Sequence, residues 1–283
     1  MSITVALLHT TCYRYSRPAG LSPQTIRLRP SPHCRTPILS YSLKITPANH
    51  SFHWIQDPQG NYLARVVFPK PISEFKVEVN LVADLVSINP FDFFLEDYAQ
   101  NFPFCYDPTL QDELAPYLKL PEEGGPDWKS FISSVDTSPR QSIHFLVDLN
   151  QRVNQAVSYS ARMEPGILTP EQTLARRLGS CRDSTWLLIN AFRQFGLAAR
   201  FVSGYLIQLG SEPGEDIADL HAWTEVYLPG AGWIGLDATS GLLAGEGHIS
   251  LASSPNPVSA APITGSAESM ETDFDFRMSV TRV

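Results

Sequence analysis

The first third of the chain alternates apolar and polar residues in short runs, as strands with one buried face do. The clearest runs occupy residues 41–45, 62–68 and 75–85. Residues 57–61, which read Asp-Pro-Gln-Gly-Asn, have the composition of a tight turn. No helical period interrupts this pattern, so we expect an antiparallel β-sandwich over residues 1–87.

The pattern changes twice after the predicted sandwich. Residues 88–137 mix aromatic residues with proline and acidic residues, and we interpret them as a connecting segment. Residues 138–141 then read Ser-Pro-Arg-Gln, where a capping serine and a proline at the first helical position predict a helix start. Residues 169–172, Thr-Pro-Glu-Gln, predict a second helix start, and Gly179 is expected to end that short helix in the left-handed conformation.

A third helix is predicted over residues 181–195. Ser180 and Asp183 form a Ser-x-x-Asp capping pattern at its start, and Gly196 follows its last apolar residue. Cys181 is therefore expected in the first turn of this helix.

Strands follow these helices and complete the second domain. They are predicted at residues 200–206, 223–228 and 233–237. Helices followed by strands indicate an α+β catalytic domain, which we place at residues 138–283. A last alternating run at residues 274–280 predicts one more strand, although the pattern does not say which sheet it joins.

Charge and hydropathy narrow the function. The formal net charge is −8 and no run of lysine or arginine is present, which argues against nucleic-acid binding. No apolar stretch is long enough to cross a bilayer. The short apolar run at residues 3–8 has neither a preceding basic region nor a small-residue cleavage site. We therefore expect a cytoplasmic protein that binds neither nucleic acid nor membranes.

The cysteines are far apart and show no CxxC spacing, which argues against both a zinc ribbon and a disulfide framework. They are Cys12, Cys34, Cys105 and Cys181. The histidines other than His221 have no ligand-like spacing either. We expect free thiols, no metal and no other cofactor.

Cys181 is the strongest candidate for chemistry. A thiol in the first turn of a helix faces unpaired backbone N–H groups and the positive end of the helix dipole, which favour thiolate over thiol. The other three cysteines are better explained as small, inert residues.

His221 and Asp237 are candidates for the partners of this thiol. His221 lies at the start of one predicted strand and Asp237 at the end of the next. In an antiparallel hairpin they share a face only if the residue numbers of paired positions add up to an even number, or if a bulge restores the register. Trp223 lies on the same face as His221, where it either lines a substrate cleft or belongs to the core.

Three segments resemble the motifs of the bacterial transglutaminase-like superfamily. They are Gly-Ser-Cys181-Arg-Asp, Asp-Leu-His221-Ala-Trp-Thr-Glu-Val-Tyr-Leu and Gly-Trp-Ile-Gly-Leu-Asp237-Ala-Thr. Residues 13–15 and 21–30 also resemble the β-rich region that precedes this core in bacterial members. The resemblance implies a papain-like α+β core with a Cys181/His221/Asp237 triad. It leaves the reaction open, because members are described as transglutaminases, proteases, amidases and inactive homologues.

These observations predict a cysteine protease or amidase that acts on a peptide or protein substrate through a thioester acyl-enzyme. We expect hydrolysis to exceed transamidation, because a transferase needs a passage that keeps water from the thioester. Trp223 and Trp186 are the aromatic residues that would wall such a passage. The alternatives are protein-glutamine transamidation and a non-catalytic binding scaffold.

Overall fold

The N-terminal part of the chain forms two antiparallel sheets that face each other, as the alternating pattern predicts. The computed structural model describes residues 2–283 except 121–123, 163, 165 and 213. The strand orders are β17-β1-β6-β3 and β16-β2-β5-β4. The strands from this part of the chain are β1 (Ser2–Ala19), β2 (Gln24–Ile26), β3 (Ile38–Thr46), β4 (Ser51–Gln56), β5 (Tyr62–Val67) and β6 (Ile72–Val86).

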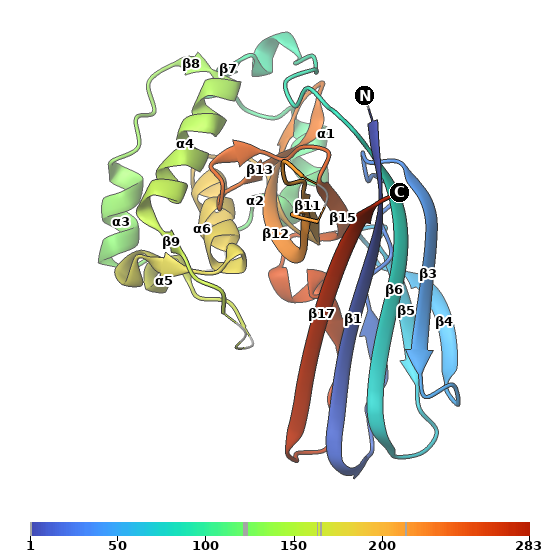
Figure 1. The fold of residues 1–283 in the computed structure, drawn as a ribbon. Helices are drawn as coiled ribbons and strands as arrows, with labels where there is room; N and C mark the ends of the chain where they lie inside the picture. The colour runs from blue at the N-terminus through green and yellow to red at the C-terminus, as the bar shows by residue number, and fades with distance from the viewer. Residues whose placement is uncertain (1, 121–123, 163, 165, 213) are drawn as a thin grey trace.

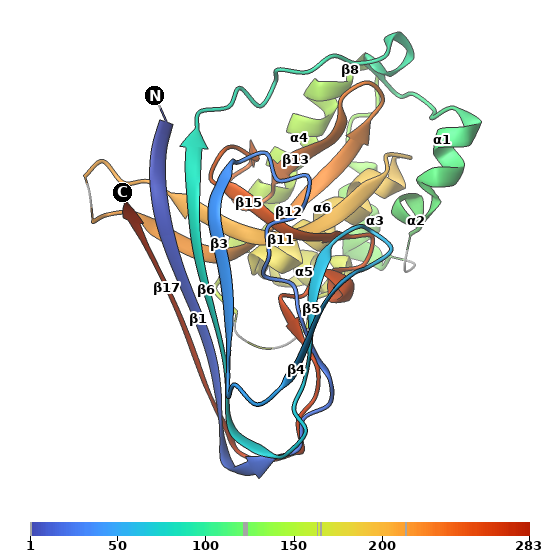
Figure 2. The same ribbon diagram turned by 90° about the vertical axis from the view of Figure 1, so that its right-hand side faces the viewer.

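The end of the chain completes these N-terminal sheets. Strand β17 (Thr272–Arg282) pairs antiparallel with β1, and β16 (Ile263–Thr264) pairs with β2. Figures 1 and 2 show β17 beside β1 along its length. The assignment of all of residues 138–283 to the catalytic domain therefore needs correction at its end. Strand β17 pairs with the backbone groups that β1 would otherwise expose at the sheet edge. The sequence of residues 272–282 alone does not indicate that β1 is the partner.

The second part of the chain is built on a five-stranded sheet with the order β14-β13-β12-β11-β15. Its strands are β11 (Ala199–Gln208), β12 (Ile217–Leu228), β13 (Gly232–Asp237), β14 (Leu242–Leu243) and β15 (His248–Ser254). The helices are α1 (Pro108–Glu113), α2 (Ala115–Leu118), α3 (Pro126–Ser133), α4 (Ser142–Ala156), α5 (Pro170–Arg176) and α6 (Cys181–Gln194). The predicted α+β class is confirmed.

Short elements complete the description. Two 3₁₀ turns lie at Asp97–Ala99 and Pro257–Ala260. Strand β7 (Asn101–Phe102) pairs with β8 (Arg140–Gln141), and β10 (Leu178–Gly179) pairs in parallel with β9 (Ser158–Tyr159). No helix of the described residues has the length and apolar character needed to cross a membrane.

The five-stranded sheet lies between the helices and the N-terminal sheets (Figure 1). One core contains apolar residues of α4 and α6 together with sheet residues such as Phe201 and Leu236. A second core joins the two N-terminal sheets and includes Tyr205 and Ile249 from the central sheet. Phe201 and Tyr205 lie towards opposite ends of β11, so apolar burial along this strand ties the central sheet to both layers.

A buried histidine also links the layers. His9 of β1 has no exposed surface, and its ring nitrogens lie 2.8 Å from the hydroxyls of Tyr205 and Thr11. Burial lowers the pKa of His9 to about 4. The imidazole is therefore neutral at neutral pH and serves as a hydrogen-bonding group between β1 and β11.

Two of the three predicted helix starts are confirmed, and one is wrong. Thr169 and Ser180 begin capping boxes at α5 and α6. Helix α4 begins at Ser142, not at residue 138, because Arg140–Gln141 is used as a strand against β7. The Ser142 side chain donates to the carbonyl of Ala99, which anchors this later start.

The predicted end of α5 also needs correction. Its left-handed residue is Arg177, with φ of 51°, and not Gly179. Gly179 lies in β10, where a Cβ would approach the Asp183 side chain to 3.0 Å. Glycine at this position therefore leaves room for the cap of α6.

Candidate active site

Cys181 is the first residue of α6, as predicted. Asp183 accepts hydrogen bonds from the backbone N–H of Ser180 (2.9 Å) and from its hydroxyl (2.7 Å). The first N–H groups of a helix have no partner within the helix, so the end that carries Cys181 presents donors and a positive dipole. The Cys181 side chain is partly exposed, and all four cysteines are free thiols.

Asp183 is a fully buried structural carboxylate. Besides Ser180 it binds Arg162 (2.9 Å) and the backbone N–H of Leu168 (2.8 Å). Burial acts to raise the pKa of Asp183, but the hydrogen bonds from Arg162, Leu168 and Ser180 lower it below its usual value. These bonds satisfy the carboxylate completely, which supports its interpretation as a helix cap and ties the preceding loop to the start of α6.

The hairpin of β12 and β13 has the register that the site requires. Tyr227 pairs with Trp233 and Leu228 with Gly232, so the residue numbers of each pair add up to an even number and the loop contains three residues. Gly232, with φ of +76°, is in a left-handed conformation that favours glycine at this turn. His221 and Asp237 therefore share one face of the sheet without a bulge.

His221 and Asp237 form a buried pair. Nε2 of His221 lies 3.2 Å from Oδ2 of Asp237, and the two side chains are 8% and 3% exposed. Burial acts to lower the pKa of His221, but interactions with Asp237 and with the Cys181 thiol raise it to about 10. Burial acts to raise the pKa of Asp237, yet His221 and His248 hold it well below its ordinary value. The arrangement favours an imidazolium beside a carboxylate.

Helix α6 is fixed against strand β12 by two buried threonines. The Thr185 hydroxyl donates to the carbonyl of Ala222 (3.0 Å), and the Thr224 hydroxyl donates to the carbonyl of Thr185 (3.3 Å). The two bonds engage Ala222 and Thr224, which follow His221 along β12. They hold the helix that carries Cys181 against the strand that carries His221.

The segment after Asp237 is held by helix α4. Asn150 donates to the carbonyls of Asp237 and Leu242, and Asn154 donates to those of Ala238 and Thr239. These asparagines lie four residues apart, so they occupy one face of the helix. Sequence reasoning missed them, although two amides at this spacing on an amphipathic helix were a usable signal.

The Asp237 carboxylate has further donors from its own turn. The backbone N–H of Thr239 donates to Oδ1 (2.8 Å), and the Ser240 hydroxyl lies 3.1 Å from Oδ2. The same hydroxyl lies 3.4 Å from the Asp237 carbonyl oxygen. Hydrogen bonds to the charged form favour ionisation, so this turn helps to keep Asp237 a carboxylate.

His248 is a site residue that sequence reasoning missed. Its Nε2 lies 3.5 Å from Oδ2 of Asp237, and its ring packs edge-on against Trp223 with centroids 5.2 Å apart. The chain crosses from β14 at one edge of the sheet to β15 at the other, and this crossing places His248 beside the hairpin. Its distance from His221 in the sequence left no local signal.

Two histidines and one carboxylate form a cluster whose atoms lie within 4.8 Å of one another, a spacing that could hold a metal ion. However, the Gly245 N–H donates to Nδ1 of His248 (3.1 Å). A metal-ligating histidine ordinarily donates a proton from its second ring nitrogen. Here Nδ1 accepts a hydrogen bond instead of donating one, so the three side chains fit a hydrogen-bonded cluster better than a metal centre.

Trp223 does not line a substrate cleft. The side chain is only 2% exposed, although it lies on the face of His221 as predicted. A Cβ at Gly204 would approach the Trp223 ring to 2.5 Å, so glycine in the middle of β11 makes room for the indole. The assignment of Trp223 to substrate binding is therefore corrected: it supports His248 from within the core.

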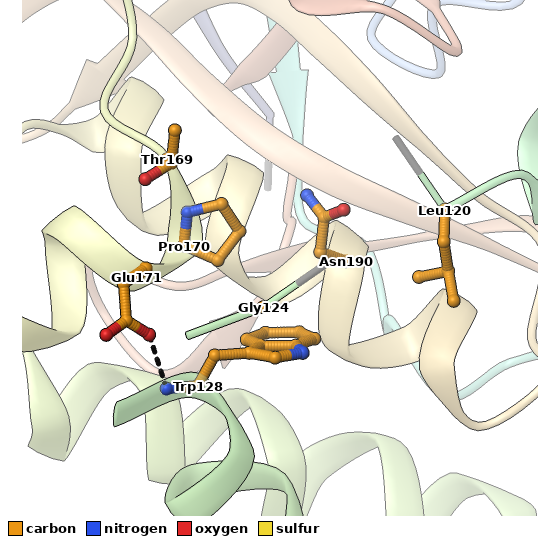
Figure 3. A pocket seen from close by; sticks show the side chains of 7 residues that line it. All are labelled: Leu120, Gly124, Trp128, Thr169, Pro170, Glu171 and Asn190. Carbon is orange, nitrogen blue, oxygen red and sulfur yellow. Dashed lines mark hydrogen bonds between the residues drawn. The ribbon is translucent and has the colours of Figure 1, made fainter. Parts of the chain in front are cut away.

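Two hollows lie outside the Cys181 face. A cavity of about 390 Å³ where β1 and β6 meet the central sheet is lined by Ile3, Leu85, Leu206, Leu209 and His248, among others. Figure 3 shows a smaller pocket where Trp128 of α3 meets α5. There the Glu171 carboxylate accepts hydrogen bonds from the backbone N–H groups of Asp127 and Trp128, so it caps α3. Neither hollow is lined by Cys181 or His221.

The two acidic neighbours of His221 on β12 differ. Glu225 forms a buried ion pair with Arg200 (2.6 Å), whose guanidinium lies over the Trp233 ring. Asp219 is at an exposed position of β12, although partial desolvation of its carboxyl group raises its pKa. Neither carboxylate contacts the His221–Asp237 pair through a hydrogen bond in the described residues.

The fold and the site together define a class: an α+β core in which a cysteine at a helix start faces a histidine–aspartate pair on the adjacent sheet. Residues 5–84 match the bacterial transglutaminase-like N-terminal region, and residues 129–238 match the transglutaminase-like superfamily. The chain carries a bacterial transglutaminase-like N-terminal region followed by a transglutaminase-like core.

Relatives and solved structures extend this similarity over the whole chain. An uncharacterized protein of Mycobacterium tuberculosis is 26% identical over 271 residues, which cover 91% of this chain and 85% of that protein. One of Mycobacterium leprae is 22% identical over 98% of both chains. A Cytophaga hutchinsonii structure, described as a candidate cysteine protease, has a TM-score of 0.72 at 17% identity and covers 100% of this chain and 91% of that one. This last likeness shows the fold.

Proposed function

We propose that the protein is a cysteine protease or amidase that cleaves an amide bond of a peptide or protein through a thioester acyl-enzyme. The observation that carries the proposal is the placement of a helix-start thiol, Cys181, against an imidazole that Asp237 holds at 3.2 Å. A raised pKa of about 10 for His221 favours the ion pair of thiolate and imidazolium over the neutral pair.

In the first half-reaction the Cys181 thiolate attacks the amide carbonyl carbon. The carbonyl π electrons move to oxygen, and the N–H groups at the start of α6 stabilise the resulting oxyanion. The His221 imidazolium then gives its proton to the amide nitrogen as the C–N bond breaks. The amine leaves, the acyl group remains on sulfur, and His221 is neutral.

In the second half-reaction neutral His221 takes a proton from water, whose oxygen attacks the thioester. Collapse of the tetrahedral intermediate releases the carboxylic acid and restores the thiolate and the imidazolium. Asp237 stays ionised throughout and keeps Nε2 of His221 as a donor. The ring nitrogen Nδ1 is then the one that exchanges a proton with sulfur and substrate.

Hydrolysis is favoured over transamidation by the positions of the two tryptophans. Trp223 is buried, and Trp186 packs against the helical core with the Arg193 guanidinium 5.4 Å from its ring centroid. Neither side chain therefore serves as the wall of a passage that guides an amine and excludes water. Water is present at about 55 M against millimolar amines, so an unshielded thioester is hydrolysed.

The test is an activity profile of wild type and Cys181→Ala on glutamine-containing and ordinary peptides, with and without a labelled primary amine. We expect free acid and amine or ammonia from wild type only. Incorporation of label beyond hydrolysis at millimolar amine would instead indicate a transamidase.

Thiol labelling with iodoacetamide across pH supplies a control that needs no substrate. Cys105 is exposed and is the matched reference, whereas Cys12 is buried and its pKa is raised by burial and by Glu74. We expect Cys181 to react faster than Cys105 at neutral pH and below. Rapid labelling without any product would favour a binding scaffold, and equal labelling of both thiols would remove the catalytic proposal.

A further inference from the structure

The Asp237 carboxylate is shared by two imidazoles, although the proposed reaction uses only one. Nε2 of His221 lies 3.2 Å and Nε2 of His248 lies 3.5 Å from the same oxygen, Oδ2. The His248 side chain is 12% exposed, and its buried Nε2 makes no regular hydrogen bond in the described residues, with Oδ2 of Asp237 at 3.5 Å. A buried ring nitrogen in this position must either donate to Asp237 or lose its hydrogen bonding.

The hydrogen bond at the other side of the His248 ring determines which atom carries the proton. The Gly245 N–H donates to Nδ1 of His248 at 3.1 Å. Nδ1 must therefore hold a lone pair, and the proton of the neutral ring is on Nε2. Oδ2 of Asp237 lies 3.5 Å from that nitrogen, and the lone pairs of a carboxylate can accept its proton in a hydrogen bond.

The surroundings hold the ring in this orientation. His248 packs edge-on against the buried Trp223 ring, and its backbone N–H donates to the Gly245 carbonyl at 3.0 Å. The ring cannot turn without losing both the Gly245 bond and the contact with Trp223. A contact of 3.5 Å is long for a hydrogen bond, and such contacts in active sites commonly tighten during the reaction.

We propose that His248 is a positioning residue that donates its Nε2 proton to Asp237 and so fixes the carboxylate against His221. The inference rests on the proposed function, since it assigns a role beside the same triad. This bond adds a donor from β15 to those that the turn after Asp237 supplies, and it restrains Oδ2 beside His221. His248 itself does not touch the substrate.

Two amide variants separate this role from simple packing. In His248→Gln the side-chain amide can reach the position of Nε2 and donate to Asp237. In His248→Asn the shorter side chain can accept from Gly245 but does not reach Asp237. Both lose the imidazole ring and its contact with Trp223, so they are matched in the packing that they remove.

We expect His248→Asn to lower kcat and the Cys181 alkylation rate about 10- to 100-fold, with KM little changed. This is the effect expected from the loss of one hydrogen bond to a charged group. His248→Gln should stay within about threefold of wild type. Histidine ¹⁵N NMR of Cys181→Ala should show His248 protonated on Nε2. Equal losses in Gln and Asn, or a proton on Nδ1, would overturn the inference.

The alkylation assay also keeps this inference separate from the proposed function. If wild-type Cys181 reacts no faster than Cys105, the catalytic proposal fails and the role of His248 fails with it. If wild-type Cys181 is fast and His248→Asn is equally fast, only the positioning role is wrong. Melting temperatures of both variants identify any loss that comes from unfolding.

Discussion

Two buried histidines of this protein behave in opposite ways. His9, between the first N-terminal strand and the central sheet, is surrounded by the hydroxyls of Tyr205 and Thr11 and the ring of Phe276. His221 is surrounded by Asp237 and Cys181. The pKa of His9 falls to about 4, and that of His221 rises to about 10.

Burial alone does not determine the charge of an imidazole. Both rings lose hydration, which opposes the charged form. Hydroxyl groups satisfy the hydrogen bonds of a neutral ring but supply no charge, so desolvation decides at His9. A carboxylate in contact reverses the outcome at His221. His9 joins two layers of the structure, and His221 carries the charge that the proposed proton transfer requires.

The largest expected effect follows from removing the carboxylate. Asp237→Asn should lower kcat/KM about a thousandfold, because an amide neither stabilises the imidazolium nor selects the reactive tautomer. Asp219→Asn is the matched control, since Asp219 is also near His221 but makes no hydrogen bond to it in the described residues. It should change the rate by less than about threefold. Equal losses would show that only net charge matters.

The second prediction concerns stability at alkaline pH. The folded pKa of His221 lies above its ordinary value of 6.5, so its stabilising contribution is complete below pH 6.5 and is lost as pH rises towards 10. In a Cys181→Ala background Asp237 alone raises the pKa of His221, so the shift is smaller and we expect a loss of about 3 kcal/mol as pH rises above 6.5. His221→Gln should flatten the curve. Urea unfolding at each pH measures it, and an unchanged slope would contradict the assigned pKa.

The third prediction concerns the opposite pH range. The folded pKa of His9 lies below 6.5, so its contribution is complete above pH 6.5 and is lost as pH falls towards 4. We expect a loss of about 2 kcal/mol across this range, which His9→Gln should remove while keeping hydrogen bonds to Tyr205 and Thr11. The same urea series measures it. If both variants altered the same pH range, the contrast between the two sites would be wrong.

The smallest expected effect is at Ser240. Its hydroxyl lies 3.1 Å from Oδ2 of Asp237, but it has a second acceptor in the Asp237 carbonyl, and Thr239 still holds Oδ1. Ser240→Ala should therefore lower kcat/KM only about two- to fivefold. Ser42→Ala, at an exposed position of β3, should have no effect. A loss as large as that of Asp237→Asn would mean that Ser240 is essential to the carboxylate.

Local patterns predicted much of the transglutaminase-like core. The capping box at Ser180 and Asp183 placed Cys181 at a helix start because capping depends on residues within one turn. For His221 and Asp237 to share a face, the loop between β12 and β13 had to contain an odd number of residues, and it contains three. The same reasoning failed for α4, where pairing of Arg140–Gln141 with a distant strand replaced a locally favoured helix start.

The amino-acid sequence was enough to predict the α+β class, the helix that carries Cys181 and the hairpin that carries His221 and Asp237, because each depends on residues close together in the chain. Three other features follow only from long-range contacts. Strand β17 joined the N-terminal sheet, Trp223 became buried, and His248 reached Asp237. These outcomes depend on which surfaces come together when distant parts of the chain pack. Hydrophobic burial drives this packing, but it is non-directional, so the local sequence does not identify the partner of each surface.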